Sequence, residues 1–173
     1  MTSVTLRRFE CAKADCGKPF DRAVVLGDIR DAWGSEQAFD QFAGNDEQWI
    51  CVVRGAGERA FSAGNDLKYQ AAGGGMAAIP ESGFAGLTSR FNLTKPVIAA
   101  VNGVAMGGGM EIALACDLII ASENARFALP EPKVGLAALA GGMQRLPRQI
   151  GMKNAMGMML TGRHVEAAEA KEL

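Results

Sequence analysis

The sequence predicts an α/β fold in which buried strands alternate with helices. The first observation is the segment 97–101, V-I-A-A-V, which is apolar and partly β-branched without alternation, a pattern typical of a strand covered on both faces. The second is the segment 110–116, which has a helical composition and follows a turn and three glycines. The third is the return of short apolar strands at 118–121 and 126–129, which continues the rhythm of strand and helix.

Length and composition indicate a single domain over residues 1–173. Of the 173 residues, 49% are hydrophobic and 21% are charged, which is enough apolar material for a substantial core. The net charge is −1 and the sequence has no basic cluster, so the charge pattern disfavours nucleic acid as a partner. Neither a signal-peptide pattern nor an apolar run of bilayer length occurs, and we expect a cytoplasmic protein without a membrane partner.

The first part of the chain has weak patterns followed by a clear one. Residues 4–6 favour a first strand, an apolar patch covers 23–26, and 35–42 favours a short helix. Residues 49–53 combine aromatic and β-branched side chains and predict a buried strand. A glycine turn at 54–58 follows this strand.

The later part of the chain predicts mostly helices. Alanine and glycine dominate residues 69–78, which favours a loop, and residues 82–90 favour a helix. Three further helices are predicted near the end of the sequence, over residues 141–150, 152–160 and 166–173. In the second of them Met152, Met156 and Met159 recur at helical spacing, which favours packing into the core.

The cysteines and the single histidine do not form a familiar reactive site. Cys11 and Cys16 have a C-x4-C spacing that matches no common zinc pattern, so we expect free thiols and no metal site. Cys51 and Cys116 lie in apolar segments and are expected to be small core residues. His164 would have to serve any Ser-His-Asp or Cys-His arrangement, but the sequence has no glycine-elbow serine, and we expect a structural role.

Two glycine-containing turns place backbone amides at the ends of strands. Gly107, Gly108 and Gly109 precede a helix, so the N–H groups of its first turn can face a developing negative charge. Glu111 follows these donors, and the turn A-F-S-A-G-N-D-L-K at 60–68 has the same character. Two such turns can supply one N–H each to a single oxygen. A structural alternative stays open, in which the glycines permit close helix packing and Glu111 favours the helix dipole.

Glu131 is the second acidic candidate. Pro130 and Pro132 fix the backbone on either side of it, which places a carboxylate at a rigid strand end. Val134 and Leu136 follow and favour a buried turn. A solvated glutamate on a surface turn is the structural alternative.

Four blocks of sequence occur in a fixed order: S-A-G-N-D-L, N-G-V-A-M-G-G-G-M-E, F-A-L-P-E-P-K-V-G-L and G-G-M-Q-R-L-P-R-Q-I-G. Together they resemble the enoyl-CoA hydratase/isomerase (crotonase) family, and the resemblance runs from about residue 49 to residue 173. The last two blocks are more similar to the carnitinyl-CoA dehydratase branch than to the general fatty-acid hydratases.

This resemblance implies a crotonase-like fold, a spiral of ββα units, with the C-terminal helical part of the family truncated. It also implies an enzyme that adds water reversibly to the double bond of a 2-enoyl-CoA thioester, with coenzyme A as part of the substrate and neither a cofactor nor a metal. Family members form trimers or dimers of trimers, which implies a homo-oligomer. The implied site residues are Glu111 and Glu131 as the catalytic pair, the amides of Asn65 and Gly108 as the oxyanion hole, and Ala63, Asp66 and Leu67 as contacts of coenzyme A.

The chain departs from the family pattern in two places. Residues 1–46 are atypical and lack the asparagine-arginine-proline turn that helps to cover coenzyme A. Ala138 and Leu139 stand where family hydratases often have a proline-glycine pair, which implies a reshaped acyl pocket and a small or polar acyl group such as crotonyl or crotonobetainyl. Two alternatives stay open: a double-bond isomerase of the same fold, and an inactive truncated member that acts as a scaffold or partial binding module.

Overall fold

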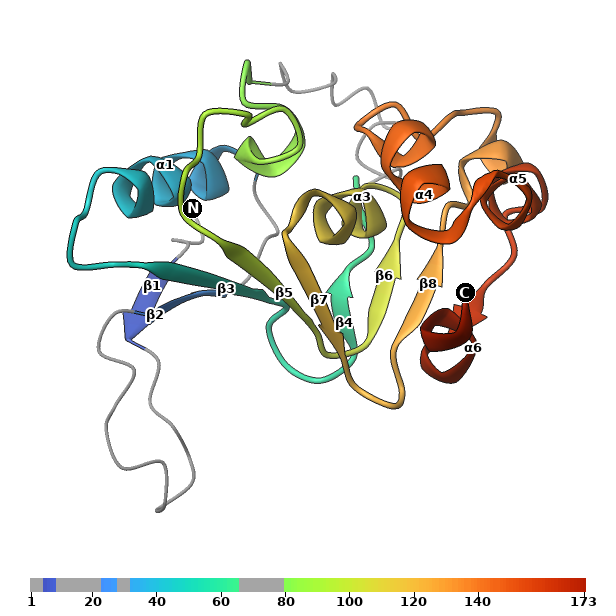
Figure 1. The fold of residues 1–173 in the computed structure, drawn as a ribbon, viewed down its shortest axis with the longest axis horizontal. Helices are drawn as coiled ribbons and strands as arrows, with labels where there is room; N and C mark the ends of the chain where they lie inside the picture. Colours follow the sequence, from blue (N-terminus) through green and yellow to red (C-terminus); the bar gives the residue numbers. More distant parts are fainter. Residues whose placement is uncertain (1–4, 9–22, 28–31, 66–79) are drawn as a thin grey trace.

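The computed structural model describes residues 5–8, 23–27, 32–65 and 80–173, and Figure 1 shows how their elements are arranged. The strands are β1 (Thr5–Arg8), β2 (Ala23–Gly27), β3 (Ile50–Arg54), β4 (Ala60–Ser62), β5 (Val97–Val101), β6 (Val104–Met106), β7 (Leu118–Ala121), β8 (Arg126–Ala128) and β9 (Val165–Glu166). The helices are α1 (Ala32–Ala43), α3 (Gly108–Ala115), α4 (Gly142–Ile150), α5 (Met152–Thr161) and α6 (Ala167–Glu172), with the 3₁₀ helices η1 (Phe84–Gly86) and η2 (Glu131–Val134). Within these ranges no helix is long and apolar enough to cross a membrane.

The strands form two sheets, and the chain alternates between them. The larger sheet has the order β1-β2-β3-β5-β7 and the smaller one the order β4-β6-β8-β9. Neighbouring strands are parallel except in the pairs β1–β2 and β8–β9. The successive pairs β3 and β4, β5 and β6, and β7 and β8 each contribute one strand to each sheet, and α3 follows β6 as η2 and α4 follow β8. This succession agrees with the expected ββα units and confirms an α/β fold.

A short turn carries the chain from the larger sheet to the smaller one between β5 and β6. Asn102 in this turn donates from Nδ2 to the carbonyl oxygens of Gly55 and Gly57 at 3.2 and 2.8 Å. Its Oδ1 accepts the N–H of Gly55 at 3.1 Å. One amide side chain thus ties the turn after β5 to the turn after β3, and both turns lead toward the strands that end at the candidate site.

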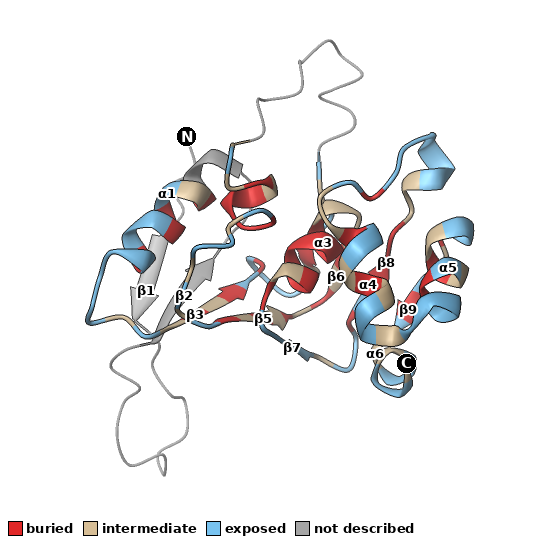
Figure 2. Ribbon diagram, turned by 45° about the horizontal axis from the view of Figure 1, so that its top comes forward, coloured by how far each residue is buried: buried red, intermediate tan, exposed pale blue. Residues whose placement is uncertain are grey.

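The core lies between the sheets and the helices, and α3 is buried at its centre. Figure 2 shows α3 buried along most of its length, whereas α5, α6 and β7 carry many exposed residues. Ile112 and Leu114 of α3 are buried, as are Val97, Ala99 and Val101 of β5. The intervening β5 residues are half-buried, so the expected strand is confirmed but only one of its faces is fully covered.

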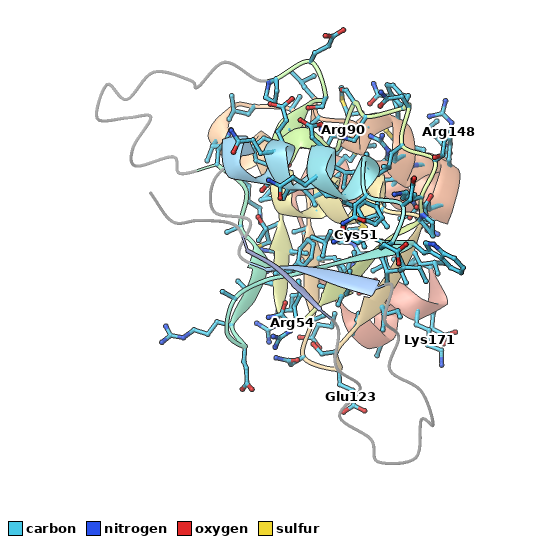
Figure 3. All side chains as sticks on the ribbon, turned by 90° about the vertical axis from the view of Figure 1, so that its left-hand side faces the viewer. Cys51, Arg54, Arg90, Glu123, Arg148 and Lys171 are labelled. Carbon is cyan, nitrogen blue, oxygen red and sulfur yellow. The ribbon has the colours of Figure 1, made fainter. Side chains whose placement is uncertain are left out.

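The described cysteines are core residues, as expected. Cys51 and Cys116 are buried free thiols, and Figure 3 shows Cys51 in the interior of the molecule. Burial raises the pKa of the Cys51 thiol to about 12 and also raises the pKa of Cys116. Cys11 and Cys16 lie outside the described residues.

The predicted helix at 82–90 is wrong. Only the 3₁₀ turn η1 forms there, because Gly83, Ala85 and Gly86 all have positive φ angles, of 85°, 55° and 67°. A right-handed helix requires negative φ at each residue, so these three positions interrupt it. Ala85 is the only non-glycine residue with a positive φ in the described part of the chain, and it is buried.

The helix predicted at 152–160 is confirmed, but its expected core face is wrong at two positions. Met152 and Met156 are 61% and 38% exposed. The buried residues of α5 are instead Ala155 and Met158, which lie three residues apart on another side of the helix. The spacing of the methionines identified a helix but not the side that packs.

β7 forms one edge of the larger sheet and is exposed along its length. It pairs with β5 in register, with Leu118 opposite Ile98. Leu118 and Ile120 are 58% and 62% exposed, although the sequence of this strand is entirely apolar. The short strands β4, β6 and β9 were not predicted, and β4 lies within the segment 60–68 that was interpreted as a turn.

Candidate active site

Three glycines form the N-terminal end of α3. Gly107 has φ 55° and ψ −129°, and its N–H donates to the carbonyl of Ala128 at 3.0 Å. The N–H of Glu111 donates to the carbonyl of Gly107 at 3.0 Å and begins the hydrogen bonds of the helix. The N–H of Gly108 precedes that first bond, so it belongs to the donors for which a helix has no acceptor of its own. Gly109 packs against the end of β4, because a Cβ there would lie 2.5 Å from the carbonyl carbon of Ser62.

The loop after β4 passes beside the start of α3. A Cβ on Gly64, which has φ 79°, would lie 2.9 Å from the nitrogen of Gly108. The N–H of Gly64 donates to Oγ of Ser62 at 3.3 Å. The exposed Asn65 follows, so the two expected amide donors, Asn65 and Gly108, are contributed by neighbouring segments. Ala63 is exposed in the same loop, whereas Asp66 and Leu67 lie outside the described residues.

Glu111 is buried on α3 and is held by the first turn of α4. Its exposed fraction is 4%, and Oε1 accepts the N–H of Gly142 at 2.9 Å. A Cβ on Gly142 would lie 2.9 Å from the Cβ of Ala138 and 3.1 Å from Glu111 Oε1, so the two helices meet closely at this glycine. Burial raises the pKa of Glu111, the Gly142 hydrogen bond lowers it, and the charge of Glu131 raises it.

Glu131 opens the turn η2 immediately after Pro130, and its carboxylate lies against the glycines of α3. A Cβ on Gly107 would lie 3.3 Å from Glu131 Oε1. The Oε2 atom is buried and has no hydrogen-bond partner in the described part of the chain. Burial raises the pKa of this carboxyl group. The expected buried turn is wrong for Val134 and Leu136, each 55% exposed, so only the glutamate turns inward.

This arrangement combines a pair of carboxyl groups with backbone N–H donors, two features that enzymes acting on carbonyl compounds use. Two carboxyl groups with raised pKa values can divide the roles of proton acceptor and proton donor. Backbone N–H groups at a helix start and a neighbouring loop can stabilise an oxyanion. The unpartnered Oε2 of Glu131 is a buried acceptor that a water molecule or a ligand could satisfy.

Sequence reasoning missed three neighbours of this site. The pair Gly141-Gly142 was interpreted only as a helix start, yet Gly142 supplies the hydrogen bond to Glu111 across 31 residues. A Cβ on Gly108 would lie 2.6 Å from Cε1 of Phe84, so the ring of Phe84 covers this glycine. Arg145 reaches from α4 to the carbonyl of Thr88 at 2.8 Å. The block that contains Arg145 carried the resemblance, but no local pattern indicated these contacts.

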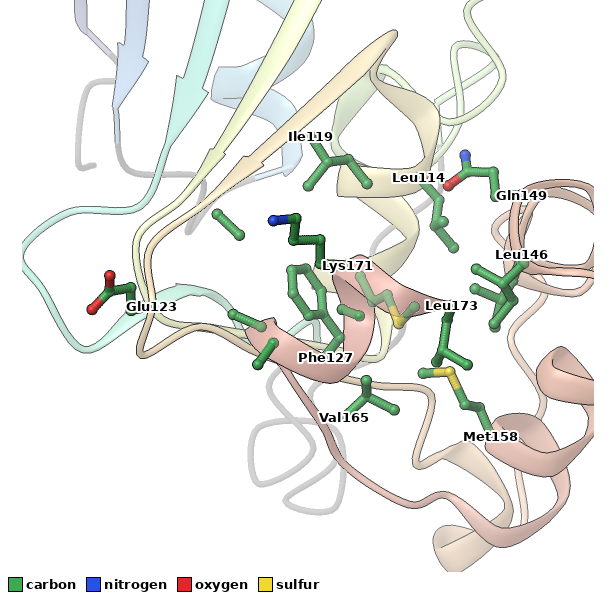
Figure 4. Close-up of a pocket in the computed structure, with 16 residues that line it drawn as sticks. Leu114, Ile119, Glu123, Phe127, Leu146, Gln149, Met158, Val165, Lys171 and Leu173 are labelled. Atoms are coloured by element: carbon green, nitrogen blue, oxygen red, sulfur yellow. The ribbon is translucent and has the colours of Figure 1, made fainter.

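A large apolar groove lies apart from the two glutamates. Its volume is about 880 Å³, and Figure 4 shows apolar side chains from α3, α4, α5 and α6 that surround it. Met110 and Leu114 of α3 face this groove, whereas Glu111 does not line it. The polar side chains at the groove are Glu123, Gln149 and Lys171. The groove and the acidic site are therefore different features of α3.

No cluster of three potential metal ligands from histidine, cysteine, aspartate and glutamate occurs among the residues that the structure describes. The expectation that the chain uses no metal stays a prediction. His164 is exposed between α5 and β9.

Comparison with known proteins supports a specific family. A family model described as enoyl-CoA hydratase/isomerase matches residues 34–173. The chain is similar to a carnitinyl-CoA dehydratase of Salmonella enteritidis PT4, with 46% identity over 144 residues, which make up 83% of this chain and 55% of that relative. The chain thus spans about half the length of the curated relatives that it matches.

Solved structures agree with this comparison. A carnitinyl-CoA dehydratase from Mycobacterium avium 104 has a TM-score of 0.82 and 39% identity, over 90% of this chain and 65% of that one. An enoyl-CoA hydratase from Mycobacterium tuberculosis H37Rv has a TM-score of 0.81 and 37% identity, over 90% of this chain and 64% of that one. The likeness confirms the crotonase-like fold that the sequence blocks implied.

Proposed function

The chain belongs to the enoyl-CoA hydratase/isomerase family, and from this premise we propose that it catalyses the reversible addition of water to a 2-enoyl-CoA thioester. The observation that carries the proposal is that Glu111 lies on α3 and Glu131 lies beside Gly107 at the start of this helix, near enough for the charge of Glu131 to raise the pKa of Glu111. One carboxylate is fixed by a backbone N–H, and the other has a buried oxygen without a partner in the described residues. Hydration needs two such groups, because a water molecule must be oriented and a proton must be delivered.

In the proposed reaction the two glutamates hold the attacking water between them. The water oxygen bonds to the β-carbon as one carboxylate accepts its proton, and the α-carbon receives a proton from the other carboxyl group. The thioester oxygen gains enolate charge in between, and the N–H groups of Asn65 and Gly108 stabilise it. Removal of one donor of this kind costs roughly 10²–10³ in rate in enzymes that use them.

The substrate class follows from the family and from the residues beside the acidic pair. We propose that Ala63, Asp66 and Leu67 contact the coenzyme A part of the substrate, with no further cofactor. Ala138 is buried near Gly142, whereas Leu139 is 75% exposed. Relatives named carnitinyl-CoA dehydratases support a small or polar acyl group, of the crotonyl or crotonobetainyl kind. A homo-oligomer and a cytoplasmic location stay predictions.

The test is the loss of conjugated thioester absorbance when the purified chain meets crotonyl-CoA. We expect turnover by the wild type and a loss of at least about 10²-fold in Glu111→Gln and in Glu131→Gln, because each removes one acid–base group. Glu123→Gln is the matched control, since Glu123 is an exposed glutamate in the turn after β7 and should keep the wild-type rate. A folded wild type without turnover would reject the hydratase proposal for this chain. Conversion of a 3-enoyl-CoA without hydration would favour the isomerase instead.

A further inference from the structure

Arg145 of α4 lies on the helix turn that holds Glu111, and its charge acts on that carboxyl group. Its backbone N–H donates to the carbonyl of Gly141 at 2.9 Å. Its guanidinium covers the α-carbon of Gly141, so a side chain at that position would collide with Nη1. Gly141 has φ 107°, which suits glycine alone. The guanidinium therefore lies directly over the turn from which Gly142 donates to Glu111.

The other end of the guanidinium reaches the segment around η1. Arg145 Nη2 donates to the carbonyl oxygen of Thr88 at 2.8 Å. Thr88 is buried, with an exposed fraction of 3%, and its Oγ1 accepts the N–H of Phe84 at 2.8 Å. The ring of Phe84 in turn covers Gly108. A short chain of contacts thus leads from Arg145 to the glycine that carries the proposed oxyanion donor.

We propose that Arg145 is a positioning residue that fixes the carboxylate of Glu111 and the N–H of Gly108 relative to each other, by joining the first turn of α4 to the Thr88 carbonyl. This inference rests on the proposed function, in which both groups act on one substrate. A planar guanidinium with several N–H donors suits a tie between two backbone segments better than a flexible ammonium group. Arg145 makes no ion pair within the described part of the chain, so its charge is not neutralised there.

The charge of Arg145 also acts on Glu111. Among the described residues, the charged groups that act on this carboxyl group are Glu131 from η2 and Arg145 from α4. Burial raises the pKa of Glu111 most, Glu131 raises it as well, and Arg145 lowers it. Loss of the arginine should therefore raise the pKa of Glu111 further, in addition to loosening its position.

The experiment compares Arg145→Met, which removes both the charge and the tie, with Arg145→Lys, which keeps the charge but loses the planar group. For crotonyl-CoA hydration we expect kcat to fall roughly 10-fold to 100-fold in Arg145→Met and by less in Arg145→Lys, with KM changed far less than kcat. Glu111 sets the acid limb of the kcat profile if it accepts the proton and the alkaline limb if it donates it, and this limb should move to higher pH in Arg145→Met and stay in place in Arg145→Lys. A general loss of stability would lower the active fraction without moving this limb.

A second measurement does not need turnover. The amide signal of Gly142, followed by NMR with ¹⁵N-glycine labelling, should titrate with Glu111 because the N–H donates to its Oε1. The midpoint should rise in Arg145→Met and stay near that of the wild type in Arg145→Lys. Arg148→Met is the matched control: Arg148 is exposed on the same helix, and its Nη1 donates to the carbonyl of Gln144 at 2.6 Å. We expect wild-type kcat and a wild-type titration in this control.

The outcomes separate this inference from the proposed function. A wild type without turnover would reject the hydratase proposal, while the Gly142 titration would still decide whether Arg145 acts on Glu111. A folded Arg145→Met with the wild-type kcat, pH profile and Gly142 titration would overturn the inference. If Arg145→Met fails to fold, Arg145→Lys decides. A wild-type kcat in Arg145→Lys would show that the link between α4 and the Thr88 carbonyl does not position Glu111, and would overturn the inference.

Discussion

Substitution of Gly109 by alanine tests the close approach of α3 to the end of β4. A Cβ at this position would lie 2.5 Å from the carbonyl carbon of Ser62, and the carbonyl oxygen would be nearer still. Carbon atoms pack at about 3.5–4.0 Å, so the helix start must move by about 1 Å. The obstacle is backbone and cannot rotate away as a side chain would.

The expected size of the effect combines two opposing contributions. Overpacking against backbone is taken at the upper end of its usual range, about 3 kcal/mol, and alanine regains about 1 kcal/mol of helix propensity, which leaves a net loss of about 2 kcal/mol. For a domain of this size that loss lowers Tm by roughly 4–8 °C. The N–H of Gly108 moves with the helix start, and a displacement of about 1 Å at a reacting group costs roughly 10²-fold in rate.

Thermal unfolding followed by circular dichroism measures the first effect, and crotonyl-CoA hydration measures the second. Gly157→Ala is the matched control, because Gly157 lies inside α5 with no heavy atom within 4 Å of its would-be Cβ. That variant should gain about 0.5–1 kcal/mol and keep the wild-type rate. If Gly109→Ala were as stable and as active as Gly157→Ala, the reasoning from close packing at α3 would be refuted.

Buried groups give three further expected outcomes. Burial raises the pKa of Glu111 above the ordinary 4.5, so above this pH the folded chain keeps a proton that the unfolded chain releases. The wild type therefore loses stability as the pH rises from 4.5 through the raised pKa. Glu111→Gln should therefore melt higher than the wild type at about pH 8, with the advantage gone at about pH 4; an advantage that persists at low pH would contradict the assignment. The N–H of the buried Val97 donates to Oδ2 of Asp117 at 2.7 Å. Asp117→Ala removes this acceptor and should lower the free energy of unfolding, measured with urea, by ~1–3 kcal/mol, whereas Asp117→Asn keeps an acceptor and should lower it less. Cys51 and Cys116 should react with a maleimide at about pH 8 only after unfolding, as peptide mapping would detect, and rapid labelling of the native chain would argue against their burial.

Much of the regular structure could be predicted because its patterns are local. The strands at β5 and β7 and the helix α3 follow from runs of apolar residues and a glycine turn, which need no knowledge of their neighbours. β6 could not be predicted, because its three residues become a strand only by pairing with β4 and β8. The exposure of β7 could not be predicted either. Its sequence is apolar throughout, but its place at the edge of the sheet depends on the topology.

The candidate site shows the same division. The glycines before α3 predicted a helix start with outward amides, and Glu111 and Glu131 were named from local context and from the family resemblance. The partner of Glu111 was not foreseen, because the Gly142 N–H reaches it from another helix. Composition also predicted a helix at 82–90, where positive φ angles instead turn the chain so that Phe84 covers Gly108. Such contacts depend on distances between segments, which local patterns do not contain.

The alternation of strands between two sheets also constrains how the chain folds. β3 pairs with β5 and β5 with β7, while β4 and β6 intervene in the sequence and belong to the other sheet. These parallel pairings are non-local, and non-local contacts slow folding because the loop between the strands must close first. From β3 to β8, each strand added to one sheet is followed in the sequence by a strand of the other sheet. Refolding should therefore regain compactness early and the geometry around α3 late, so that the proposed hydration activity should return with the slowest kinetic phase.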